Sequence, residues 1–139
     1  MNTVLQRRQP NDGFSLRELL AVTLIVGLLA SIAIPLFLDQ RKKGHDAEAK
    51  NSLNSVATAI VGYAETNAKL PTVTVSGSSV SFGDGTVATL GQGVVLGPLS
   101  GSTPELWCID DKQPHGDRAK VKGYKYSSTA EKVEEGQCV

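Results

Sequence analysis

The chain has 139 residues, and its 14 basic and 14 acidic residues give a formal net charge of zero. This balance argues against a chain-wide electrostatic partner such as nucleic acid, which favours a basic surface. Once the apolar run at residues 19–38 is set aside, about a hundred residues remain, enough for one small domain with a marginal core.

Residues 1–13 are polar, and their last four, PNDG, interrupt secondary structure just before the apolar run. The twenty residues from Leu19 to Leu38 carry no charge, and about 20 apolar residues let a helix cross a hydrocarbon core of ~30 Å. The sequence therefore predicts a membrane-spanning helix. A cleaved secretory signal is the alternative, but its apolar core is shorter, at about 7 to 15 residues.

Charge does not decide the orientation of this span, because the positive-inside rule finds equal numbers of basic residues on its two sides. Those before the span are Arg7, Arg8 and Arg17, and those after it are Arg41, Lys42 and Lys43.

Beyond the span a helical period continues to residue 66, and we expect one helix whose first half is apolar all round and whose second half is amphipathic. Pro35 lacks a backbone donor and should kink or loosen this helix, and Gly27 weakens it further. The apolar residues of the second half recur at steps of three and four: Ala49, Leu53, Val56, Ala57, Ile60 and Ala64.

From residue 71 onward, short segments rich in β-branched and aromatic residues alternate with glycine and proline. They predict a small antiparallel sheet whose apolar face is covered by the amphipathic half of the helix, so the expected fold class is α+β. The expected strands are TVTVS, SVSF, TVATL, GVVLGPL, ELWCI and GYKYSS.

The two cysteines, Cys108 and Cys138, both follow the span. An even pair on one side of a membrane favours a disulfide bond and an exported compartment. Two buried thiols remain the alternative.

A glutamate, Glu18, stands at the start of the apolar run. The segment from Ser15 to Glu18 fits the S-x-x-E capping box, in which the hydroxyl and the carboxylate accept hydrogen bonds from free backbone donors. The positive end of the helix dipole also favours an acidic residue here. Capping alone would therefore explain this glutamate.

The segment GFSLRE and the apolar run after it resemble the processing site of type IV prepilins, in which a short charged leader ends in glycine. Phe14 stands where the family has its new N-terminus, and Glu18 matches the glutamate at the fifth mature position. Gly27 and Pro35 stand where the family commonly has helix-loosening residues. The sequence AIPLFLDQRKKGHDAEAK also resembles the pilins of Gram-positive bacteria. Taken together, the resemblance to type IV pilins covers residues 8–66.

This resemblance implies a filament subunit. A prepilin peptidase would cut after Gly13 and methylate the new amine of Phe14, and Glu18 would act in subunit assembly. The partners would be other copies of the chain, the peptidase, the pilus assembly machinery and, before assembly, the membrane. A minor or competence pilin whose head binds DNA or a partner, and a type II secretion pseudopilin, are the alternatives.

The resemblance also assigns the regions and their location. The head would lie outside the cytoplasmic membrane before assembly and on the extracellular pilus afterwards, in a fibre used for adhesion or twitching motility. The regions are a leader at residues 1–13, a spanning and fibre-core half of the helix at 14–38, an amphipathic half at 39–66 and a β-rich head at 67–139.

Arg17 departs from the family pattern, which usually has an apolar residue at this position. It could offset the charge of Glu18, or it could extend to the lipid head groups while its stem covers apolar surface. Neighbouring positions of a helix point about 100° apart, which favours the second interpretation.

No catalytic set is recognisable, and we expect no enzyme, no cofactor and no metal. His45 and His115 lie far apart in the sequence and belong to no Ser-His-acid pattern.

Asp110, Asp111 and Asp117 fall in a segment that is expected to be an acidic loop, and such loops are more often solvated than calcium-binding. The segment RAKVKGYKYSS could contact single-stranded nucleic acid, but such a strand face is commonly just solvated, so we do not expect nucleic acid as a partner. Trp107 reads as a core residue.

Overall fold

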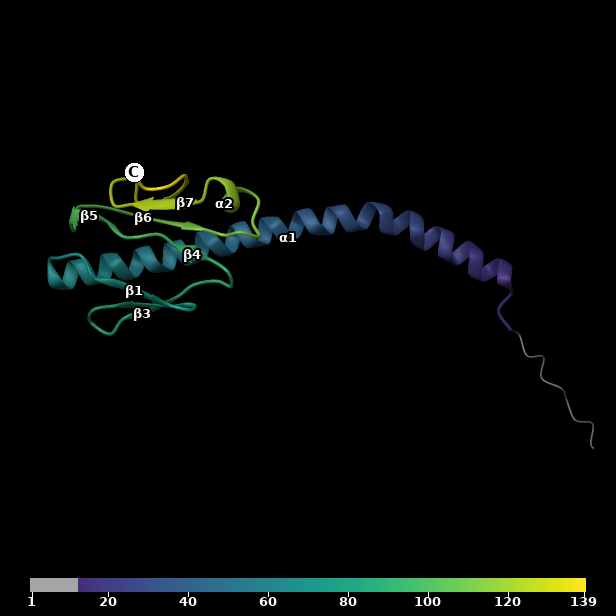
Figure 1. Ribbon diagram of the computed structural model, residues 1–139, viewed down its shortest axis with the longest axis horizontal. Coiled ribbons are helices and arrows are strands. Elements are labelled where there is room, and N and C mark those ends of the chain that lie inside the picture. The colour runs from purple at the N-terminus through teal and green to yellow at the C-terminus, as the bar shows by residue number, and fades with distance from the viewer. Residues whose placement is uncertain (1–12) are drawn as a thin grey trace, which may run out of the picture. The chain divides into compact units, whose positions relative to one another are not determined.

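The computed structural model describes residues 13–139 (Figure 1). The chain forms two compact units, one ending at Phe37 and the other running from Leu38 to Val139, which we call the second unit. The predicted leader at residues 1–13, with Arg7 and Arg8, lies almost entirely outside the described residues.

Helix α1 runs from Leu16 to Asn67 and is continuous through Pro35. It ends where Ala68 adopts a left-handed conformation with φ of 54° and donates its N–H to the carbonyl of Ala64 at 2.8 Å. A left-handed residue that satisfies a free carbonyl is a common way to terminate a helix. The period of the sequence thus predicted a single helix with nearly the observed end.

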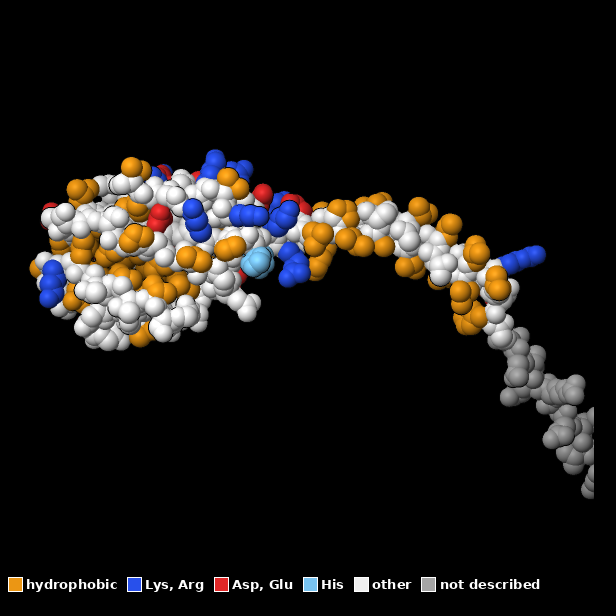
Figure 2. All heavy atoms as spheres, viewed as in Figure 1, with side chains coloured by type: hydrophobic (Ala, Val, Ile, Leu, Met, Phe, Trp, Pro, Cys, Tyr) orange, Lys and Arg blue, Asp and Glu red, His pale blue; other side chains and the backbone are white. Residues whose placement is uncertain are grey.

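On the face of the first half of α1 that Figure 2 shows, apolar side chains (orange) project to the surface along both edges of the helix. From Leu19 to Leu38 each large apolar side chain is more than half exposed. This is the one helix among the described residues that is long and apolar enough to cross a membrane.

The first sheet has three antiparallel strands in the order β1-β2-β3. They are β1 (Val73–Ser76), β2 (Ser79–Phe82) and β3 (Val87–Thr89). Ser76 pairs with Ser79, so a two-residue turn joins β1 to β2, and its first residue, Gly77, has φ of 62°. Tight hairpins favour glycine at such a position because they require a positive φ.

The second sheet has five antiparallel strands, ordered β4-β6-β7-β8 with β5 also pairing with β6. The short helix α2 (Arg118–Val121) lies between β6 and β7 in the sequence. The strands are β4 (Val95–Leu96), β5 (Ser100–Thr103), β6 (Leu106–Lys112), β7 (Tyr124–Ser127) and β8 (Val133–Glu135).

Within the second unit, Figure 1 shows α1 with β1 and β3 on one side and β6 and β7 on the other. The core joins side chains of the helix with side chains of both sheets, and the predicted apolar stripe of the helix is buried throughout. From the helix the core takes Ala49, Leu53, Val56, Ala57 and Ile60, and from the sheets it takes Val80, Phe82, Trp107, Ile109 and Tyr124.

The predicted α+β arrangement of a long helix on antiparallel strands is confirmed, and the strands divide into two sheets. The segment GVVLGPL yields only the two-residue strand β4, since Gly97 and Pro98 follow and proline cannot donate to a sheet. Strand β5 was not predicted because its residues, SGST, are typical of turns. Helix α2 and strand β8 were also not predicted.

Candidate functional site

The start of α1 contains half of the predicted capping box. The N–H of Ser15 donates to Glu18 Oε2 at 2.9 Å, and the carbonyl of Ser15 accepts the N–H of Leu19 at 3.1 Å. Gly13 and Phe14 precede the helix, and the Phe14 side chain is 86% exposed. Between residues 13 and 139 no ion pair joins Arg17 to Glu18.

The two hydroxyl groups of the apolar run are satisfied by its own backbone. Thr23 donates to the carbonyl of Leu20 at 2.9 Å, and Ser31 donates to that of Leu28 at 2.7 Å. Such internal bonds leave no free polar group to be buried in lipid or in an apolar fibre core. Gly27 has no other residue within 4 Å of an added Cβ, so packing within this chain does not require a glycine there.

Cys108 on β6 and Cys138 near the end of the chain form a disulfide bond, with their Cα atoms 5.8 Å apart. The predicted pair is therefore bonded, and no cysteine of the described chain is free. Asp110 Oδ2 accepts the N–H of Cys138 at 3.2 Å. The two contacts together hold the C-terminal tail against the middle of β6.

Asp46, on the second half of α1, is a buried carboxylate that the sequence analysis missed. Its Oδ1 accepts the N–H groups of Asp117 at 2.9 Å and Ala119 at 3.0 Å, and its Oδ2 accepts that of Arg118 at 3.1 Å. A Cβ on Gly116 would lie 2.3 Å from Asp46 Oδ1, so the turn before α2 needs a glycine. Asp46 stands three residues before Ala49, in phase with the apolar stripe, and this position was the available signal.

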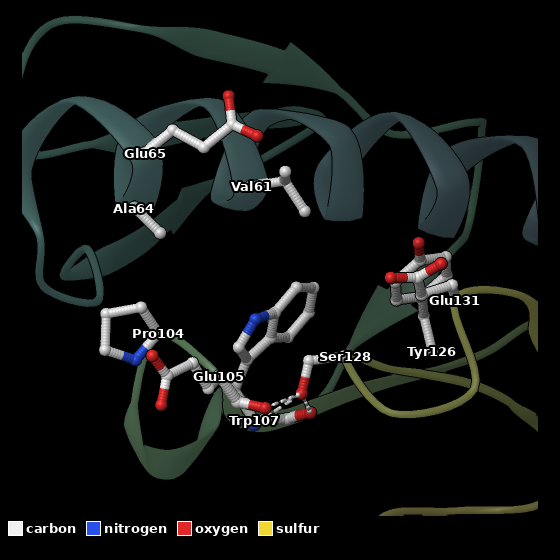
Figure 3. Close-up of a pocket in the computed structure, with 9 residues that line it drawn as sticks. All are labelled: Val61, Ala64, Glu65, Pro104, Glu105, Trp107, Tyr126, Ser128 and Glu131. Carbon is white, nitrogen blue, oxygen red and sulfur yellow. Dashed lines mark hydrogen bonds between the residues drawn. The ribbon is translucent and has the colours of Figure 1, made fainter.

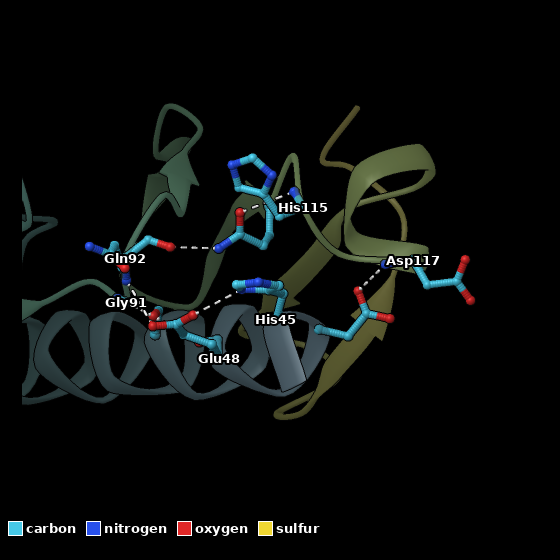
Figure 4. A network of polar contacts seen from close by, with 9 residues as sticks. His45, Glu48, Gly91, Gln92, His115 and Asp117 are labelled. Carbon is cyan, nitrogen blue, oxygen red and sulfur yellow. Dashed lines mark hydrogen bonds and ion pairs between the residues drawn. The ribbon is translucent and has the colours of Figure 1, made fainter. Parts of the chain in front are cut away.

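Glu48 and Ser52 hold the turn before β4 against α1. Glu48 Oε1 accepts the N–H of Gln92 at 2.8 Å, and Ser52 Oγ accepts that of Gly91 at 2.7 Å, as Figure 4 shows for the labelled residues. Buried Gln113 donates to the carbonyl of Gln92 at 2.7 Å and thereby links the same turn to the end of β6.

The fold brings His45 and His115 together. Their ring centroids are 5.8 Å apart, and His45 Nδ1 lies 3.5 Å from Glu48 Oε2 (Figure 4). The two histidines also line a shallow groove of about 480 Å³ with Arg41 and Lys42. This groove is thus basic.

The three aspartates of the predicted acidic loop do not converge. Asp110 and Asp111 lie on strand β6 rather than in a loop, and successive residues of a strand point to opposite faces. The backbone N–H of Asp117 donates to the Asp46 carboxylate, so Asp117 lies beside Asp46. Between residues 13 and 139 no group of three or more His, Cys, Asp or Glu side chains could hold a metal ion.

Asp111 is a buried carboxyl group, with its side chain packed inside the second unit and the residue only 1% exposed. Neither of its carboxylate oxygens has a hydrogen-bond partner. Burial raises the pKa of Asp111 to about 7, and the neighbouring charge of Asp110 adds to this. The second unit therefore carries a group whose protonation changes in the neutral range.

The tyrosines of GYKYSS face the interior. Tyr124 is 1% exposed and lies beneath the ammonium of Lys50 at 4.8 Å, and Tyr126 stacks on Trp107 with ring centroids 5.6 Å apart. Trp107 is 3% exposed, as expected of a core residue. Tyr124 is therefore not accessible for stacking on bases, whereas Tyr126 is half-buried and lines an open groove.

The chain is similar to two curated relatives over part of its length. It is 45% identical over 49 residues, or 35% of this chain, to the type IV major pilin protein PilA of Myxococcus xanthus. It is 30% identical over 66 residues, or 48% of this chain, to the type II secretion system core protein G of Klebsiella michiganensis.

The matched segments span 22% of the first relative and 46% of the second. No protein-family model matches the chain. No solved structure matches it either. Over the matched segments the chain is therefore similar to a type IV major pilin and to a type II secretion protein.

Proposed function

We propose that this chain is a structural subunit of a type IV pilus, cleaved after Gly13, methylated at the amine of Phe14 and polymerised through its apolar helix. The observation that carries this proposal is the helix surface at residues 19–38, where every large apolar side chain is more than half exposed. A surface of this kind must be covered by lipid or by other copies.

In a pilus subunit the apolar helix is covered first by lipid and later by other copies of the chain. The membrane accepts the helix before assembly, with the head outside, and the packed helices of other copies accept it in the extracellular fibre. The internally bonded hydroxyls of Thr23 and Ser31 suit both environments, because neither needs water. Both similarities, to a major pilin and to a secretion protein, support this assignment.

The exposure of Gly13 and Phe14 supports the proposed cleavage between them. Gly13 and Phe14 lie outside regular secondary structure and are exposed, while α1 begins at Leu16. Hydrolysis of the bond between them would add water and leave a free amine on Phe14. That amine is a cation near neutral pH, with a reference pKa of ~7.7 to 8.0, and methylation keeps its charge.

Glu18 would then act in assembly. In the single chain its carboxylate accepts one bond from the Ser15 N–H at an exposed helix start. In a packed fibre core the same carboxylate would lose water, at a cost of several kcal/mol unless a cation pairs with it. The Phe14 amine of a neighbouring copy would supply that cation and select the axial offset between subunits.

The test is intact-mass analysis of fibres sheared from cells. The proposal expects the fibre protein to consist of residues 14–139 with a methylated N-terminus. Retention of Met1 in the fibre protein, or a cut within residues 30–33, would contradict it.

A second candidate is a subunit of a type II secretion assembly, favoured by the similarity to core protein G. Deletion of the gene separates the two. Loss of surface fibres with normal protein secretion indicates a pilus, whereas loss of secretion with no sheared fibres in the parent strain indicates the secretion assembly.

A further inference from the structure

An open groove of about 640 Å³ lies at the C-terminal end of α1, between the helix and the second sheet. Figure 3 shows the Trp107 indole in the middle of this groove, with Glu105 and Glu131 on opposite sides of it. Val61 and Glu65 contribute from the helix. The volume lies within the range of about 300 to 1,000 Å³ that is usual for ligand sites.

The groove gathers unpaired negative charge. Glu65, Glu105 and Glu131 line it, no lysine or arginine does, and none of the three forms an ion pair. The other glutamates between residues 38 and 139 each have a nitrogen partner: Glu48 with His45, Glu134 with Lys132, and Glu135 with Arg118 and Lys122. The unpaired glutamates of the second unit therefore all line this one groove, with the Glu65 carboxylate directed away from Trp107 in Figure 3.

The floor of the groove is aromatic. Trp107 and Tyr126 stack with centroids 5.6 Å apart and planes inclined by 19°. A cation near the faces of such rings is attracted by their quadrupoles. At the rim, Glu131 has φ of 50°, a left-handed conformation that is costly for a residue other than glycine. A groove lined by glutamates and by aromatic side chains is suited to a lysine or arginine side chain.

The chain carries a basic counterpart at the other end of the second unit. Arg41 and Lys42 are exposed, form no ion pair and line the groove that contains His45 and His115. Lys42 and Val61 are 19 positions apart on α1, which corresponds to roughly 30 Å along a helix. These basic side chains therefore cannot reach the acidic groove of their own chain.

We propose that the acidic groove receives Arg41 and Lys42 of a second copy of this chain. The two surfaces differ from each other and lie at opposite ends of the second unit, so the contact is head-to-tail. A head-to-tail contact that does not close into a ring repeats as an open filament. The inference rests on the proposed function, since it supplies a polar contact between heads beside the apolar contact of the helices.

The first experiment is carbodiimide cross-linking of intact cells, followed by mass spectrometry of the fibre and membrane fractions. The reagent activates a carboxylate, the lysine amine attacks it to form an amide, and the carboxylate oxygen leaves on the reagent as a urea. We expect Lys42 to be linked to Glu65, Glu105 or Glu131. The separation along α1 means that such a link joins two copies. Glu134→Gln, which removes a paired glutamate, should leave this link unchanged.

The second experiment reverses the charges. Arg41→Glu with Lys42→Glu, or Glu105→Lys with Glu131→Lys, should each reduce the number of sheared fibres by about tenfold or more, because like charges would face each other. Combining the four substitutions should restore fibres. Lys120→Glu, at another exposed and unpaired lysine, is the matched control and should have little effect.

The outcomes separate this inference from the proposed function. Normal fibres with Lys42 linked elsewhere, or no recovery in the combined variant, would overturn the inference and leave the pilus subunit standing. Links from the three glutamates to a different protein would overturn it in favour of that partner. Links between copies in membranes without any fibre would support the inference and contradict the pilus. If the cells show no such cross-links and no fibres, the inference and the proposed function are both overturned.

Discussion

Asp46 and Asp117 are 71 residues apart in the sequence, yet the Asp46 carboxylate accepts the Asp117 N–H at 2.9 Å. Through this bond and those to Arg118 and Ala119, one side chain of α1 holds the turn that begins α2. The helix and the second sheet are therefore joined by a polar clamp as well as by apolar packing.

Asp46→Ala should destabilise the fold, because it leaves three partly or fully buried backbone donors without their acceptor. We expect a loss of about 3 kcal/mol in the free energy of unfolding. Urea unfolding of the purified chain in detergent, followed by tryptophan fluorescence, measures it. Asp117→Asn is the control, since the Asp117 side chain caps nothing and is exposed. A loss at Asp46 no larger than at Asp117 would show that the clamp is unimportant.

Replacing both Cys108 and Cys138 by serine should lower the stability of the head. The bond closes a loop across a sequence separation of 30 residues, and in the chain-entropy model such a loop is worth roughly 3 to 4 kcal/mol. The measurement compares the unfolding of wild type and variant, each with and without reductant. The variant should be insensitive to reductant, and equal stability of the oxidised wild type and the variant would contradict the prediction.

Asp111 should make the second unit less stable as the pH rises. The folded pKa of about 7 lies above the ordinary value of 3.8, so the folded state binds the proton more tightly than the unfolded state. The cost of ionising the buried group is absent below pH ~4, grows between the two pKa values and is complete above about 7.

Asp111→Asn keeps the shape of the side chain and removes its charge. Relative to wild type, the variant should be nearly neutral at about pH 4 and more stable by on the order of 3 kcal/mol at about pH 8. Chemical unfolding at the two pH values gives this difference, and the comparison cancels the titration of other groups. A difference that does not change with pH would disprove the assignment to Asp111.

Glu18→Gln and Glu18→Ala distinguish capping from subunit registration. Glutamine keeps an acceptor for the Ser15 N–H, so capping alone predicts a cost of ~1 kcal/mol or less and normal fibres. Registration requires the negative charge and predicts loss of fibres with both substitutions. The variants are compared in cells by counting sheared fibres after confirming cleavage and membrane accumulation by immunoblot. Normal fibres with glutamine would exclude registration.

The sequence by itself determined the long helix and its buried face. A helix is specified by bonds between residues four positions apart and by a period of 3.6, so its pattern is recorded locally. Leu53, Val56 and Ile60, selected by spacing alone, are each fully buried. The strands TVTVS and SVSF were found for a similar reason, because the turn between them is local. The resemblance of the start to a prepilin likewise rests on consecutive residues and stays a prediction.

Only the tertiary structure decided how the strands divide into two sheets and which polar groups meet. A strand has no internal hydrogen bonds, so its existence depends on partners elsewhere in the chain, as β5 depends on β6. The same holds for the acidic groove, whose carboxylates at Glu65, Glu105 and Glu131 come from three separate segments. Each looks like an ordinary solvated glutamate in the sequence, and only folding shows that they line one groove together with Trp107 and Tyr126.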